Sequence, residues 1–258
     1  MGHARNHFQR VSAANQGSAD QLTGQQQALQ WLHTQRALLS ALQSRQAREA
    51  HKAQVLPEIT PYLQGVLQAD AGGQDTIVSY CTVWALDAGA WALALALGQY
   101  AIRHGIDMPD EFKRNAATLM VDLMADAALS GRMSGADISH HLAEALHATQ
   151  GSNMPDQSRA KAHKAIAYGL AGKTTLAGQP GDWKSLSAAT LALALGHLQQ
   201  AEQLDTNAGV KKDIAAVQKL LDAATATAAP VAAAAATPGN KPATKPATKP
   251  ATKRKPKT

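Results

Sequence analysis

The sequence predicts a mainly α-helical fold: a bundle of αα-hairpins with a long N-terminal helix and a disordered basic C-terminal tail. Alanine and leucine, two of the strongest helix formers, dominate a chain of 258 residues in which 45% are apolar and only 4% aromatic. Over residues 75–114, apolar residues recur at three- and four-residue steps, stop at Asp87-Ala88-Gly89 and resume from Trp91 to Ile102. This pattern predicts two helices folded back on each other. Because such a hairpin buries its inner face only against further elements, its neighbours should also be helical, in pairs similar to tetratricopeptide units.

The first half of the remaining chain divides into an arm, a long helix and the start of the body. Residues 1–21 contain little that could be buried, so we expect a flexible arm. Over 22–55, leucines line one side and Gln and Arg the other, which predicts one long amphipathic, basic helix for DNA binding or oligomerisation. Pro57 and Pro61 should end it, since proline cannot continue a helix.

The second half comprises the rest of the helical body, 56–222, and a tail, 223–258. Within the body, Met108-Pro109-Asp110 and Met154-Pro155-Asp156 are each expected to open a helix, and a helix is predicted over 137–148. The hexapeptide LALALG occurs at 93–98 and again at 191–196, which indicates two related helix pairs or chance in an Ala-Leu-rich chain. The tail has three Lys-Pro-Ala-Thr repeats, whose prolines exclude a regular helix.

Positive charge is concentrated at the two ends of the chain. Residues 1–55 carry a net charge of +4, residues 56–237 carry −5, and residues 238–258 carry +7. Such a distribution suits a protein whose ends contact a polyanion while its body contacts other proteins. The alternatives are a solvated helix face and a solubilising tail. The predicted DNA-binding residues are Arg10, Arg36, Arg45, Arg48, Lys52, Lys241, Lys245, Lys249, Lys253, Arg254, Lys255 and Lys257.

Two features bear on the compartment. The longest uncharged window, 88–102, is shorter than the roughly 20 residues that a membrane-spanning helix requires, so we expect a soluble protein without membrane contact. A single cysteine, Cys81, excludes a disulfide framework within one chain and fits a reducing cytoplasm.

Catalytic candidates are weak. Asp107, Asp110 and Glu111 could hold a divalent cation for phosphodiester cleavage, but a position at a helix start explains them as capping residues. His140, Glu144 and His147 share one helix face with spacing compatible with a metal site, although a solvent-facing polar stripe is the simpler interpretation. The stretch 167–174 resembles a phosphate-binding loop, but no strand precedes it, so we interpret the match as chance. We therefore expect no metal in this chain and assign no catalytic residue.

Short segments along residues 8–222 form an ordered series: Arg10-Val11-Ser12-Ala13-Ala14, Leu56-Pro57, Trp84 to Gly89, Gly105 to Pro109, Met154-Pro155-Asp156, Arg159 to Lys161, His163-Lys164, His197-Leu198-Gln199 and Ala208 to Lys212. This series resembles the small terminase subunit of temperate, contractile-tailed phages, a family often labelled terminase endonuclease subunit. The segment 169–183 departs from the family pattern.

The resemblance implies a role in DNA packaging in the cytoplasm of a bacterial host. A member of this family is expected to bind concatemeric double-stranded viral DNA at the packaging site, to form a homo-oligomeric ring and to recruit the large terminase ATPase subunit for cleavage and packaging. Magnesium and ATP are expected on the large subunit, with no cofactor in this one. Two alternatives remain: a metal-dependent endonuclease subunit that itself cuts the cohesive-end site, and a helical-repeat scaffold without a DNA role.

Overall fold

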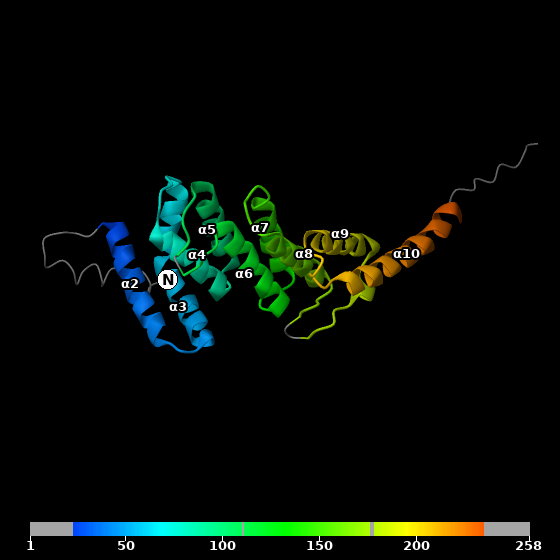
Figure 1. Cartoon of the computed structure of the whole chain (residues 1–258), viewed down its shortest axis with the longest axis horizontal. Helices are drawn as coiled ribbons and strands as arrows, with labels where there is room; N and C mark the ends of the chain where they lie inside the picture. Colours follow the sequence, from blue (N-terminus) through cyan, green and yellow to red (C-terminus); the bar gives the residue numbers. More distant parts are fainter. Residues whose placement is uncertain (1–22, 110, 176–177, 235–258) are drawn as a thin grey trace, which may run out of the picture.

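The computed structural model describes residues 23–109, 111–175 and 178–234, and within these ranges all regular structure is helical, which confirms the predicted fold class. The helices follow one another along an elongated molecule, with α2 near one end and α10 extending away at the other (Figure 1). None of the described helices is both long and apolar enough to cross a membrane. The helices are α2 (Gly24–Ala41), α3 (Arg45–Ala69), α4 (Thr76–Ala88), α5 (Trp91–His104), α6 (Ala116–Ser130), a π-helix (Ile138–Leu142), α7 (Ala143–Ala148), α8 (Asp156–Leu170), a short 3-10 helix (Trp183–Ser185), α9 (Ala188–Leu204) and α10 (Lys211–Ala234).

The helical hairpin predicted over 75–114 is formed by α4 and α5. Asp75 caps the start of α4, because its carboxylate accepts hydrogen bonds from the backbone N–H groups of Ile77 (2.8 Å) and Val78 (3.2 Å). Gly89 ends the helix in the left-handed region with φ of 74°, a conformation that glycine adopts without strain. This cap reverses the chain so that the two helices pack against each other.

The single long helix predicted over 22–55 is wrong, because the structure has two helices there. Leu42 has extended backbone angles, and the hydroxyl of Ser44 accepts a hydrogen bond from the backbone N–H of Ala47 at 3.3 Å, so a new helix begins at Arg45. An N-cap serine is a helix-start signal, and the leucine pattern itself stops at Leu42, just before it. The interruption lets α2 fold back on α3.

The prediction that Pro57 and Pro61 end this helix is also wrong, because α3 continues to Ala69. Both prolines are solvent-exposed and four residues apart, so their rings share the outer face of the helix. The opposite face buries Ile59 and Leu63 completely or nearly so. Burial of that face stabilises the helix across the two missing hydrogen bonds.

Two other predicted boundaries need correction. No helix begins at Met108-Pro109; the segment before α6 is irregular, and α6 begins at Ala116 with Asn115 as its N-cap. In contrast, α8 does begin at Asp156, directly after Pro155. At the other end, residues 223–234 are part of α10 rather than of a disordered tail, in keeping with the high helix propensity of alanine. Residues 1–22 and 235–258 lie outside the described residues.

The molecule has two hydrophobic clusters that meet at α8. The larger cluster takes buried residues from α2 to the first part of α8, up to Ile166. The smaller one begins at Ala167 and Tyr168 and includes residues of α9 and α10. Ile166 belongs to the larger cluster and its neighbour Ala167 to the smaller one. Helix α8 therefore couples the C-terminal helices to the rest of the body.

The two LALALG hexapeptides lie in α5 and α9 but face their surroundings differently. Ala94 is fully buried in α5, whereas Ala192, at the same place in the second copy, is exposed. A β-carbon on Gly98 would clash with the sulfur of Met120, whereas no described residue outside its own helix turn lies within 4 Å of one on Gly196. The shared sequence therefore does not mark structurally equivalent repeats.

Candidate nucleic-acid interface

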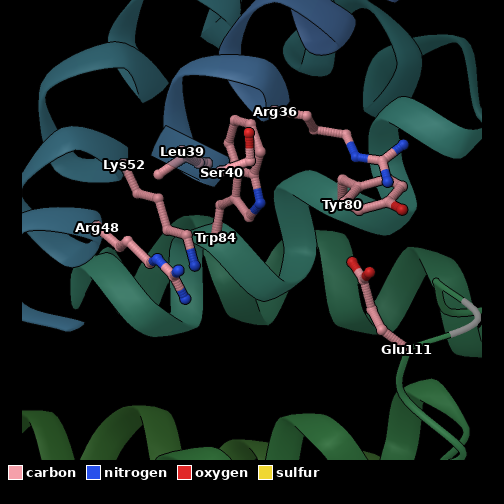
Figure 2. A pocket seen from close by; sticks show the side chains of 8 residues that line it. All are labelled: Arg36, Leu39, Ser40, Arg48, Lys52, Tyr80, Trp84 and Glu111. Atoms are coloured by element: carbon pink, nitrogen blue, oxygen red, sulfur yellow. The ribbon is translucent and has the colours of Figure 1, made fainter. Parts of the chain in front are cut away.

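The predicted basic residues of α2 and α3 surround a pocket that the two-helix arrangement creates. It has a volume of about 350 Å³ and lies where these helices meet α4, with one further residue from the irregular segment after α5. Its lining side chains, which define the Arg36–Arg48 pocket, are Arg36, Leu39, Ser40, Arg48, Lys52, Tyr80, Trp84 and Glu111 (Figure 2). Only the break between α2 and α3 allows Arg36 and Arg48 to border one hollow.

Arg36 is held over an aromatic ring. Its guanidinium carbon lies 4.3 Å from the centroid of the Tyr80 ring, a cation–π arrangement that fixes an otherwise flexible side chain. Arg36 is exposed, and no described carboxylate forms a salt bridge with it. Its charge is therefore free to attract an anion.

Arg48 both shapes the pocket and supplies charge to it. Its Nε donates a hydrogen bond of 2.6 Å to the backbone carbonyl of Leu42, which satisfies an otherwise unpaired carbonyl group at the end of α2. Among the described residues it has no salt bridge, so its terminal nitrogens can serve a ligand. Lys52 lies one helical turn further on, but its ammonium group is 2.5 Å from Asp87 Oδ2 and its side chain is only 15% exposed. Arg48 and Arg36 therefore supply most of the available positive charge.

Arg45 does not belong to this pocket, although the sequence grouped it with the others. It forms a salt bridge of 2.8 Å with Glu49, and its side chain is 79% exposed. Both residues border a second pocket of about 610 Å³, whose lining also includes Asp126 and Arg132. The other predicted DNA-binding residues lie outside the described residues: Arg10, Lys241, Lys245, Lys249, Lys253, Arg254, Lys255 and Lys257.

The sequence candidates for metal binding do not form a cluster. Within the described part of the chain, no three His, Cys, Asp or Glu side chains converge as a ligand set would require. His140, Glu144 and His147 are all exposed to solvent. Asp107 uses its backbone carbonyl to accept a hydrogen bond from Ser79, Glu111 borders the Arg36–Arg48 pocket, and Asp110 lies outside the described residues.

The segment that resembles a phosphate-binding loop has a structural role. Residues 167–170 form the last turn of α8, with no strand before them. The ammonium group of Lys173 lies 2.6 Å from Asp213 Oδ1 and 4.3 Å from the centroid of the Tyr168 ring. Tyr168 donates its own hydrogen bond to the other Asp213 oxygen at 2.8 Å. Lys173 therefore joins the end of α8 to α10.

Sequence reasoning missed the aromatic part of the pocket. Tyr80 and Trp84 are four residues apart on α4 and so lie on one face, and this spacing could have been noticed beside the basic residues. Ser40 carries no comparable signal, because its place in the pocket depends on where α2 ends. Glu111 was singled out for a metal site, whereas it borders a pocket that Arg36, Arg48 and Lys52 also line.

Comparisons with known proteins identify the family. A family model described as phage small terminase subunit matches residues 29–157. A terminase, endonuclease subunit, of Escherichia phage P2 is 33% identical over 224 residues, which cover 84% of this chain and 85% of that protein. This chain belongs to the phage small terminase subunit family. No solved structure matches it. All eight lining residues of the Arg36–Arg48 pocket fall inside the part matched by the family model, whereas α9 and α10 lie beyond it.

Proposed function

We propose that this small terminase subunit binds double-stranded viral DNA at the packaging site, oligomerises into a ring and delivers the DNA to the large terminase ATPase subunit for cleavage and packaging. The observation that carries the DNA-binding part is the Arg36–Arg48 pocket. Two exposed guanidinium groups without a described salt bridge border this one pocket, within the family-matched part of the chain. Guanidinium groups are well suited to phosphate, because their planar donors match its oxygens.

The basic residues outside the described ranges extend the same proposal. Arg10 and the seven basic residues of 238–258 provide charge that can neutralise further phosphates and release counterions. This electrostatic contribution to the binding free energy is independent of DNA sequence. It would add affinity, while the helical body determines where on the DNA the protein binds. Magnesium and ATP belong to the large subunit in this proposal, and the setting is the cytoplasm of the bacterial host.

The endonuclease alternative rests on the name of the phage P2 relative. On this chain it has no ligand cluster among the described residues that could carry it. The scaffold alternative predicts that removing residues 238–258 and the N-terminal arm leaves function intact.

The test is DNA binding across a salt series. The full chain is titrated against a duplex containing the cohesive-end region of its phage and against a random duplex of equal length. We expect strong, salt-dependent binding to both at low salt and preferential binding to the phage duplex as salt rises. Equal, negligible binding to both at low salt would contradict the proposal. Native mass spectrometry with and without DNA measures how many subunits the ring contains.

A further inference from the structure

The Arg36–Arg48 pocket has two chemically different ends. Arg48 on α3 forms a cationic end, where Lys52 is already paired with Asp87, and Arg36 stacked on Tyr80 forms an aromatic end. Figure 2 shows Trp84 between the two ends, with Ser40 and Leu39 beside it. Leu39 and Trp84 are 9% and 4% exposed, so they form an apolar floor. The pocket is therefore cationic at one side and aromatic at the other.

Paired duplex DNA would use only part of this surface. The flat faces of duplex bases are stacked inside, so a protein meets sugar, phosphate and the base edges in the grooves. An apolar, aromatic floor gains little from that contact. An unpaired nucleotide, in contrast, exposes a flat base that stacks on aromatic rings or on the plane of a guanidinium group, next to a charged phosphate.

The dimensions agree with one nucleotide. Small-molecule pockets start at roughly 300 Å³, and this pocket of about 350 Å³ is at the small end of that range. The guanidinium group of Arg36, fixed 4.3 Å from the Tyr80 ring centroid, presents its own plane for a further stacked ring. Glu111, which borders the pocket from the segment after α5, offers a carboxylate that can accept a hydrogen bond from the amino group of a base.

We propose that the Arg36–Arg48 pocket binds one unpaired nucleotide, with its phosphate at Arg48 and its base against Arg36 and Tyr80. This inference rests on the proposed DNA-binding function and specifies the form of DNA that this site takes. The same chemistry occurs in a single-stranded DNA segment and in a free nucleoside monophosphate.

The test compares a fluorescent single strand, a blunt duplex of two complementary strands and a closed circular plasmid, each bound by the full-length protein. Arg36→Lys keeps the charge but loses the planar stack, and Tyr80→Leu removes the ring. Arg45→Gln is the matched control, because Arg45 is an exposed arginine on the same helix as Arg48 but outside the pocket. We expect each pocket variant to weaken single-strand binding about five-fold or more, with duplex binding changed less than about two-fold. Arg45→Gln should change single-strand binding and duplex binding by the same factor.

The outcomes separate this inference from the proposed function. Plasmid binding by the wild type, with single-strand affinity that is the same for Arg36→Lys, Tyr80→Leu and Arg45→Gln, would overturn the nucleotide pocket and leave duplex binding intact. Single-strand binding that depends on Arg36, without plasmid binding, would support the pocket and contradict the packaging role. Competition with dTMP identifies the source of the nucleotide: displacement at concentrations near the strand's own Kd assigns the pocket to free nucleotides, and displacement only at far higher concentrations assigns it to the strand. Because Arg36 is exposed, Arg36→Lys remains informative even if Tyr80→Leu fails to fold.

Discussion

The Nδ1 atoms of His163 and His197 lie 2.9 Å apart, and this contact joins α8 to α9. At this distance one ring donates its proton to the other, so at least one of the two must be neutral. Burial is the main cause that lowers the pKa of His163 to about 4, with smaller contributions from His197 and Arg159. Burial also lowers the pKa of His197.

This contact predicts loss of stability in mild acid. Both folded-state pKa values lie below the ordinary value of 6.5, so the unfolded chain takes up protons first as the pH falls. The stabilising effect is complete above about pH 6.5 and decreases as the pH drops toward 4. Urea unfolding of the wild type at pH 7 and pH 5 should show a lower free energy of unfolding at pH 5.

The variant His163→Gln should reduce this pH dependence, because it removes the ring whose pKa is shifted furthest. The control is His33→Gln, since His33 is exposed on α2. If His163→Gln and the wild type show the same difference in free energy of unfolding between pH 7 and pH 5, other groups cause that difference.

The glycines of the two LALALG hexapeptides predict opposite effects of one substitution. Gly196→Ala should stabilise the protein by about 0.5–1 kcal/mol, because alanine favours the helix and no described atom beyond its own helix turn lies within 4 Å of the added methyl group. Gly98→Ala should destabilise it by about 1–2 kcal/mol, because the methyl group would meet the fully buried side chain of Met120. Chemical denaturation of both variants provides the comparison. Stabilisation by both would contradict the close approach of α5 to α6.

The carboxylate of Asp122 is a further test of packing. Its side chain is 6% exposed and interacts with Arg114 and with Lys161, whose ammonium group is 2.6 Å from Asp122 Oδ1. Asp122→Asn should destabilise the protein by roughly 2 kcal/mol, less than the roughly 3–5 kcal/mol for a fully buried pair, because both cations reach solvent. The matched control is Asp126→Asn, since Asp126 binds the same lysine at 3.0 Å but is 51% exposed; it should cost less than about 1 kcal/mol. Similar losses in both variants would argue against a special role for the buried carboxylate.

The sequence predicted the helical fold and the α4–α5 hairpin because periodicity and turn residues are local signals. It did not reveal the break before Ser44, because neither glycine nor proline marks that turn. Nor did the sequence predict that α3 continues past Pro57, because that depends on which face of the helix is buried. The error at Pro57 arises from tertiary packing, which a single sequence does not display.

The site was predicted only in part for the same reason. Arg36, Arg48 and Arg45 are equivalent as charges in a sequence, but only the first two border the pocket, because Arg45 lies on another side of α3 beside Glu49. The aromatic floor depends on α4 packing against α2, as the tilted pair of Trp31 and Trp84, 5.8 Å between ring centroids, shows. Long-range packing of this kind cannot be read from spacing along one helix.

The salt dependence of duplex binding tests the central claim, that Arg36 and Arg48 contact DNA phosphates, most directly. The logarithm of the binding constant is measured against the logarithm of salt concentration for the wild type, for the double variant Arg36→Gln/Arg48→Gln and for Arg45→Gln. Circular dichroism first checks that the double variant is folded, since Arg48 also bonds Leu42. Each lost phosphate contact removes about 0.9 from the slope, so the double variant should bind more weakly with a slope reduced by about 2, and Arg45→Gln should match the wild type. A folded double variant with the wild-type slope and affinity would contradict the account.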